Sequence, residues 1–142
     1  MVTGDELAWR VACFMWEREG SHAKAGLRLE VARAGFARVA LDTAPEMLNG
    51  HGTLHGGVIF TLADAAFAYA CNSYNEAAVA NQVSIVFLSP GQAGERLVAE
   101  AVEVSREGRS GVYQVVVTAA DGRVVAVFQG LSRLLGRPVL AL

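Results

Sequence analysis

The sequence predicts an α+β fold in which a largely antiparallel sheet wraps around one buried helix. The first observation is a segment at about residues 56–72, GGVIFTLADAAFAYACN, which is apolar on nearly every side and carries one charge. A helix of that composition is buried on every side. The second observation is that runs of alternating apolar and polar residues, each typical of a half-buried strand, outnumber the helical segments. The third is the Asp121-Gly122 step between two apolar runs, which is a strong hairpin signal.

The predicted elements follow one another in a simple order. Residues 5–19 have apolar residues at helical spacing and two acidic residues in the first turn, where the helix dipole favours negative charge. In that helix Leu7, Val11, Phe14 and Met15 are expected to share the buried face. Two alternating runs, at 27–33 and 36–42, predict a hairpin. A loop rich in glycine, proline and asparagine covers 43–54. After the central helix we expect strands near 78–88, 95–106, 111–120 and 123–134.

Length and composition restrict the organisation of the chain. With 142 residues, it is expected to form a single domain, residues 1–142, around one core. Hydrophobic residues make up 53% of the sequence and charged residues only 18%, which excludes a disordered protein. The surplus of apolar residues indicates contacts between subunits. One helix cannot cover a six-stranded sheet alone, so we expect dimerisation through sheet edges.

The same composition argues against a membrane protein and against a nucleic-acid-binding protein. The longest uncharged stretch, residues 77–94, contains polar residues, a proline and glycines that would make a poor membrane span. The N-terminal residues lack the pattern of a signal peptide, so a cytoplasmic location is expected. The net charge is −2, and basic residues are not clustered as nucleic-acid binding requires. Cys13 and Cys71 are expected to be free buried thiols.

Several familiar catalytic and binding motifs are absent from the sequence. It has no G-x-S-x-G nucleophile elbow, no P-loop and no complete dinucleotide-binding glycine motif. His51 and His55 are four residues apart, but a metal site needs three or four converging ligands. We therefore expect no metal site.

The segment from Asn49 to Asp64, NGHGTLHGGVIFTLAD, concentrates the remaining polar chemistry. Gly56 and Gly57 lie at the expected N-terminus of the central helix, where unpaired N–H groups and the helix dipole favour a developing negative charge. Asp64 is a lone carboxylate in an apolar run, and a buried carboxylate is costly unless it is paired or used. Asn49 and His55 add neutral polar groups. Structural alternatives remain for each: a tight turn at the glycines, a structural pair at Asp64, and a helix cap at His55.

The spacing within this segment places a limit on the site. Gly56 and Asp64 are eight residues apart on one helix, about 12 Å along its axis. One substrate carbonyl cannot contact both groups of the same chain. Either the two residues serve different sites, or a two-fold axis brings Asp64 of a partner subunit to Gly56.

The segment LNGHGTLHGGVIFTLADAAFAYACNS resembles the signature region of hotdog-fold acyl-CoA thioesterases, and most closely those of the phenylacetic acid degradation type. The resemblance continues through FLSPGQAGERLVAEAVEV and GVYQVVV, so it covers most of the chain. It implies a hotdog fold, a dimer with joined sheets that pairs into a homotetramer, and hydrolysis of acyl-CoA thioesters, with aryl-acetyl groups expected. It implies no cofactor, since CoA is part of the substrate and the product.

The resemblance also implies roles for individual residues. Asp64 of the partner subunit would act as nucleophile or general base, and the Gly56 N–H would polarise the thioester carbonyl with help from Gly57. Asn49 would orient the water or the carboxylate. His55 would hold the loop or donate a hydrogen bond near the thioester. Related thioesterases often carry a hydroxyl residue one turn after the carboxylate, where this chain has Ala68, so no water-holding role is transferred to that position.

Position alone suggests the remaining contacts with the substrate. The CoA phosphates need basic or backbone donors, and the turns that contain Ser89, Arg109 and Ser110 supply candidates, although solvated hairpins explain these turns equally well. The acyl pocket is expected to include Leu48, Thr53 and Phe60.

Two other functions are compatible with the same residues. One is a hydratase or dehydratase acting on acyl thioesters, in which His55 and Asp64 would form the acid–base pair; the glycine pair directly after His55 favours hydrolysis instead. The other is a non-catalytic acyl-CoA sensor or binding module. Binding alone does not require a carboxylate in an apolar helix, which argues against the sensor.

Overall fold

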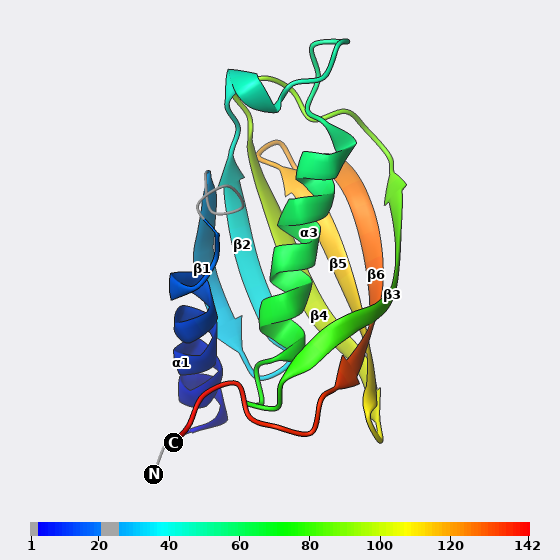
Figure 1. The fold of residues 1–142 in the computed structure, drawn as a ribbon. Helices are drawn as coiled ribbons and strands as arrows, with labels where there is room; N and C mark the ends of the chain where they lie inside the picture. The colour runs from blue at the N-terminus through cyan, green and yellow to red at the C-terminus, as the bar shows by residue number, and fades with distance from the viewer. Residues whose placement is uncertain (1–2, 21–25) are drawn as a thin grey trace.

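The computed structural model describes residues 3–20 and 26–142, and these residues form two α-helices, one short 3₁₀ helix and six strands (Figure 1). In chain order the elements are α1 (Gly4–Glu17), β1 (Leu27–Arg33), β2 (Phe36–Asp42), η1 (Pro45–Met47), α3 (Gly56–Cys71), β3 (Ala78–Phe87), β4 (Arg96–Glu107), β5 (Ser110–Ala119) and β6 (Val124–Leu134). The predicted helices and strands are all present, with ends that differ by one or two residues. The 3₁₀ helix η1 lies within the segment predicted to be a loop.

The six strands form one sheet in the order β1-β2-β4-β5-β6-β3, and every neighbouring pair is antiparallel. Helix α3 lies along one face of this sheet, as Figure 1 shows. The arrangement confirms the predicted α+β class and the hotdog fold. Strand β3 crosses over to pair with β6, so β1 and β3 form the two edges of the sheet.

The core lies between α3 and the face of the sheet that it covers. From the helix come Leu62, Ala66, Phe67 and Tyr69, all almost fully buried. From the strands come alternate residues, as the period of a half-buried strand requires; they include Val39, Leu97, Ala99, Val115, Val117, Ala126 and Phe128. Gly130 lies directly beneath the ring of Phe67, since a Cβ at residue 130 would lie 2.6 Å from Phe67 Cε1. Strand β6 therefore needs glycine where the helix packs closest.

Helix α1 begins with a capping box, in which Thr3 Oγ1 accepts from Glu6 N and the Glu6 carboxylate accepts from Thr3 N. It packs on β1, at one edge of the sheet. Its fully buried residues are Ala8, Val11 and Ala12, whereas Leu7 is only partly buried, so the predicted face was rotated by about one residue. Small side chains allow the helix to approach the strand closely.

The surface of α3 is only partly covered within the chain. Nine of its residues are buried, but Gly57 and Thr61 are exposed and Asp64 and Ala68 are partly exposed. The prediction that this helix is buried on every side is thus not met by the single chain, because the sheet covers one side of it. In the described ranges no helix is long and apolar enough to span a membrane.

Candidate active site at the N-terminus of the central helix

The N-terminus of α3 has no side-chain cap. His55 occupies the cap position in an extended conformation, and its side chain makes no capping hydrogen bond. Within the described ranges, no group accepts a hydrogen bond from the N–H of Gly56 or Gly57. The first N–H groups of the helix are therefore available to an acceptor, at the positive end of the helix dipole.

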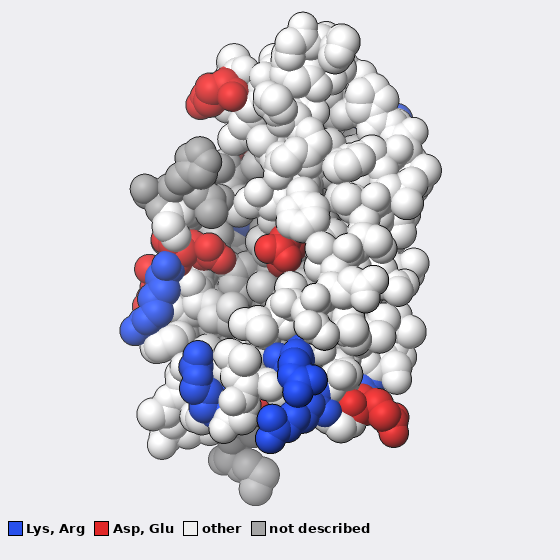
Figure 2. Space-filling model, turned by 45° about the vertical axis from the view of Figure 1, so that its right-hand side comes forward, with Lys and Arg blue, Asp and Glu red and all other residues white. Residues whose placement is uncertain are grey.

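A pocket of about 270 Å³ opens at Gly56. One wall comes from the start of α3, and the other from the end of β3 and the segment after it. Its lining is mostly apolar and consists of Leu54, Gly56, Ile59, Phe87, Leu88, Ser89 and Pro90. Figure 2 shows that the upper part of the molecule, where α3 begins, is largely uncharged. The pocket therefore suits an apolar group that carries an acceptor directed at the helix N-terminus.

Asp64 lies two turns further along α3 and is partly buried. Burial raises the pKa of this carboxyl above its usual range, and the negative charge of Glu19 raises it further. No described residue donates a hydrogen bond or forms an ion pair with it. Burial, with the Asp64 charge as a smaller cause, also raises the pKa of the Cys71 thiol to about 12, so this thiol is protonated and inert at neutral pH.

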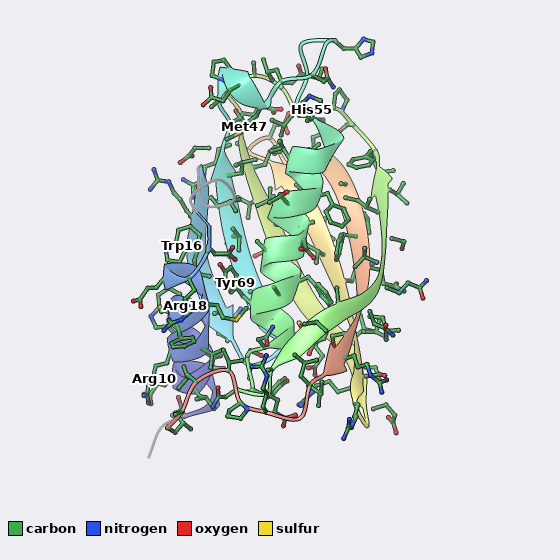
Figure 3. All side chains as sticks on the ribbon, in the orientation of Figure 1. Arg10, Trp16, Arg18, Met47, His55 and Tyr69 are labelled. Carbon is green, nitrogen blue, oxygen red and sulfur yellow. The ribbon has the colours of Figure 1, made fainter. Side chains whose placement is uncertain are left out.

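Glu19, just after α1, is held near α3 by a buried phenol. The Tyr69 hydroxyl donates to Glu19 Oε1 at 3.1 Å, and Figure 3 shows Tyr69 on the side of α3 that faces α1. This bond explains how a residue of the N-terminal segment acts on the electrostatics of Asp64.

Side-chain and backbone hydrogen bonds of Asn49 hold together residues 49–53 of the loop before α3, which we call the stapled loop. Its Oδ1 accepts from the N–H groups of His51, at 2.8 Å, and Thr53, at 3.2 Å, while its Nδ2 donates to Thr53 Oγ1 at 3.1 Å. The Asn49 N–H also donates to the Thr53 carbonyl at 2.7 Å. Asn49 and Thr53 thus contact each other in the loop that leads into His55, which Figure 3 shows at the upper end of α3.

The other predicted substrate contacts are distributed over the fold. Ser89 lines the pocket, and its Oγ donates to the Val124 carbonyl at 2.8 Å. Leu48 forms a bridge with Leu54 on the stapled loop, and Phe60 packs edge-on against Phe128 with ring centroids 5.6 Å apart. Neither lines this pocket.

Arg109 lies in the turn between β4 and β5 and Ser110 is the first residue of β5. Both are exposed, at the opposite end of the sheet from the N-terminus of α3 (Figure 1). Within one chain the structure does not bring them to Gly56. Residues 3–20 and 26–142 also contain no cluster of three histidine, cysteine or acidic side chains placed to hold a metal ion.

Four lining residues were not anticipated from the sequence: Leu54, Ile59, Phe87 and Leu88. Phe87 and Leu88 read as strand residues, and only the turn character of Ser89-Pro90-Gly91 pointed to this segment. Nothing in the local pattern indicates that the end of β3 reaches the start of α3.

Comparison with known proteins places these features in a family. A family model described as the thioesterase superfamily matches residues 51–126. The acyl-coenzyme A thioesterase PaaI of Escherichia coli (strain K12) is 42% identical over 130 residues, which are 91% of this chain and 92% of that protein. The match to the family model spans α3 and the strands β3, β4 and β5.

Solved structures agree in fold. The E. coli PaaI protein from the phenylacetic acid degradation operon superimposes with a TM-score of 0.93 at 39% identity, covering 96% of this chain and 99% of that chain. A hypothetical thioesterase of Streptococcus pneumoniae, solved with coenzyme A, gives a TM-score of 0.82 at 25% identity, covering 87% of this chain and 97% of that chain.

Proposed function

The chain belongs to the thioesterase superfamily and is an acyl-CoA thioesterase, and we propose that its active site is the pocket at Gly56, completed by Asp64 of a partner subunit. The observation that carries this proposal is the uncapped N-terminus of α3, which opens into an apolar pocket. A thioester needs a site of this kind: a donor for its carbonyl oxygen and an apolar wall for its acyl group.

The proposed reaction begins with the thioester carbonyl accepting a hydrogen bond from the Gly56 N–H. Negative charge develops on that oxygen in the transition state, and a well-placed donor of this type contributes on the order of 3 kcal/mol. Asp64 of the partner subunit takes a proton from a water molecule, whose oxygen attacks the carbonyl carbon. The C–S bond then breaks, the thiolate leaves and is protonated, and the products are a carboxylic acid and CoA. In the other form of the mechanism Asp64 attacks directly, and water hydrolyses the mixed anhydride.

The environment of Asp64 supports this assignment. Burial raises its pKa, and a carboxylate with a raised pKa is a stronger base. Among the described residues, none donates a hydrogen bond to the Asp64 carboxylate or forms an ion pair with it. Such a carboxylate contributes nothing evident to the stability of the fold, whereas it suits a group that must accept a proton.

Two exposed features support a partner subunit. Strand β3 is an edge strand ten residues long, without a charged residue, and most of its side chains are exposed. Long uncharged edges are rare in monomers because they pair with other chains. On α3, Gly57 and Thr61 are exposed and Ala68 is partly exposed, and these small residues allow a second helix to approach closely. We propose a two-fold dimer that joins β3 edges, places the α3 helices antiparallel, and pairs again into a homotetramer.

We further propose that the acyl group is an aryl-acetyl group such as phenylacetyl or hydroxyphenylacetyl. The lining side chains Ile59, Phe87 and Leu88 present the apolar and aromatic surface that such a ring needs. The E. coli relative, whose structure is described as coming from the phenylacetic acid degradation operon, supports the same class.

The test is thiol release, followed with a thiol reagent, over a panel of CoA esters. The panel contains phenylacetyl-CoA, its ring-hydroxylated forms, benzoyl-CoA, short and long straight-chain esters, and crotonyl-CoA. We expect the highest kcat/KM with the aryl-acetyl esters. Highest activity with straight-chain esters would overturn the aryl-acetyl assignment. Binding without thiol release from any ester would indicate a sensor module, and hydration of the crotonyl ester would indicate a hydratase.

A further inference from the structure

Arg123 connects the turn between β5 and β6 to the segment that lines the pocket. Its Nη2 donates to both carboxylate oxygens of Glu95, at 2.7 and 2.9 Å, and to the Pro90 carbonyl at 3.3 Å. Its Nε donates to Ser89 Oγ at 3.2 Å, and its Nη1 to Asp121 Oδ2 at 3.2 Å. Two of these acceptors, on Ser89 and Pro90, belong to residues of the pocket wall.

Residues 88–95 have no regular secondary structure, so their shape depends on such contacts. Glu95 serves as the second fixed point. One of its carboxylate oxygens accepts from Gln92 N at 2.6 Å, and its carbonyl accepts from Thr43 Oγ1 at 2.7 Å. Arg123 therefore donates hydrogen bonds to both ends of the 88–95 segment, to Ser89 and Pro90 at one end and to Glu95 at the other.

The other side of this segment supports the start of α3. The Gly91 carbonyl accepts from the Leu54 N–H at 2.8 Å. The backbones are so close that a Cβ at residue 91 would lie 2.9 Å from Leu54 Cβ. Leu54 is buried and lies two residues before Gly56. A displacement of the 88–95 segment would therefore move Leu54 and, through it, the N–H group of Gly56 that faces the pocket.

We propose that Arg123 is a positioning residue for thioester hydrolysis, which fixes the direction of the Gly56 N–H through Glu95, the 88–95 segment and Leu54. This inference rests on the proposed role of Gly56. Figure 1 shows the β5–β6 turn and the start of α3 at the same end of the molecule. The three nitrogens of the Arg123 guanidinium donate to different acceptors, and the rigid planar group therefore fixes the relative positions of those acceptors, whereas a partly exposed ion pair adds little to global stability. The arrangement is therefore better suited to setting geometry than to holding the fold.

The first experiment compares Arg123→Gln with Arg38→Gln. Arg38 makes a matched pair with Glu100, with N–O distances of 2.7 and 2.8 Å, but on the sheet and without contact to the pocket. We expect Arg123→Gln to lower kcat about tenfold or more while KM changes less than about threefold, because an oxyanion donor acts mainly in the transition state and small misplacements are costly. Arg38→Gln should leave both constants unchanged. Arg123→Lys keeps the charge but loses the fork, so it should recover only part of kcat.

The second experiment measures hydrogen exchange at residues 54–57 in the same variants. Arg123→Gln should speed the exchange of the Leu54 amide, and Arg38→Gln should not. Unchanged exchange in Arg123→Gln, or faster exchange with an unchanged kcat, would each overturn the proposal. If the wild-type protein released no thiol from any ester, the proposed function would fail, and with it the role of Arg123 in hydrolysis. The exchange comparison would still decide separately whether Arg123 holds the start of α3.

Discussion

The ring of Phe87 lies against the backbone of Gly56, such that a Cβ at residue 56 would lie 3.2 Å from Phe87 Cζ. The last residue of an edge strand therefore forms one wall of the pocket whose opposite wall is the start of the central helix. Glycine at residue 56 leaves both the aromatic wall and the N–H group undisturbed, whereas a larger residue must displace the ring.

This contact predicts the effect of Gly56→Ala. The added methyl group must push the Phe87 ring, which is half exposed and free to yield, so we expect little loss of stability. The displaced ring and the methyl group narrow the pocket, and we expect kcat/KM to fall about tenfold or more. Gly50→Ala is the matched control, since a Cβ at residue 50 meets nothing within 4 Å. Steady-state kinetics and thermal unfolding of both variants give the comparison, and unchanged kinetics in Gly56→Ala would contradict the assignment.

The shared site predicts that two inactive variants restore each other. Gly56→Val and Asp64→Asn should each be nearly inactive. In randomly mixed dimers half of the molecules are hybrids, and each hybrid has one intact site, so about a quarter of the wild-type activity should return. Differently tagged chains, co-expressed and purified through both tags, select the hybrids, in which about half of the wild-type activity should return because one of the two sites of each dimer is intact. No restoration in purified hybrids would place Gly56 and Asp64 in separate sites.

Replacing the Asp64 carboxylate with an amide should abolish thiol release without lowering the stability of the fold. We expect Asp64→Asn to retain binding of CoA esters and to lose thiol release. Because the pKa of Asp64 is raised in the folded protein, its ionised form opposes folding once the pH exceeds that pKa. Asp64→Asn should therefore unfold at a temperature no lower than wild type at neutral pH. The difference should vanish in acid, where Asp64 is protonated. Retained hydrolysis in this variant would sink the proposed role of Asp64.

The pH dependence of kcat/KM should report the same carboxyl. Ionised Asp64 is the active form, so activity should rise with pH through a pKa above the usual range near 3.9. Glu19→Gln removes the negative charge that contributes to the shift, and the acidic limb should move to lower pH. Glu17→Gln removes an exposed charge at the end of α1, and Glu17 is not among the groups that raise the pKa of Asp64. Equal movement in both variants would show that the effect is general and not due to Glu19.

The stapled loop predicts different results for two substitutions of Asn49. Asn49→Ala removes the acceptor for the His51 and Thr53 N–H groups, so the free energy of unfolding should fall by about 1–2 kcal/mol. Asn49→Asp keeps that acceptor, and its stability should be close to that of wild type. If the amide also orients the water, Asn49→Asp should still lose most of its kcat. Chemical denaturation and single-ester kinetics distinguish the two contributions, and full activity in Asn49→Asp would limit Asn49 to its structural role.

The comparison of prediction with structure shows where local patterns stop being informative. Alternation predicted the strands at 27–33 and 36–42 because one face of each is buried, and Asp121-Gly122 predicted the turn between β5 and β6 because glycine accepts the positive φ found there. The same reasoning misplaced the buried face of α1. Small residues such as Ala8 and Ala12 become buried through close helix–strand packing, which a hydrophobicity pattern does not register.

The sequence by itself determined the elements, the α+β class, the family and the candidate pair Gly56 and Asp64, because these depend on local periodicity, turn chemistry and a motif within one segment. Only the tertiary structure decided that β3 pairs with β6, that Phe87 covers Gly56, and that Arg123 reaches Ser89 and Pro90 in the wall of the pocket. These contacts join segments far apart in the chain. They arise because the sheet packs around α3, and this packing sets the distances between residues of different segments, which no segment specifies by itself.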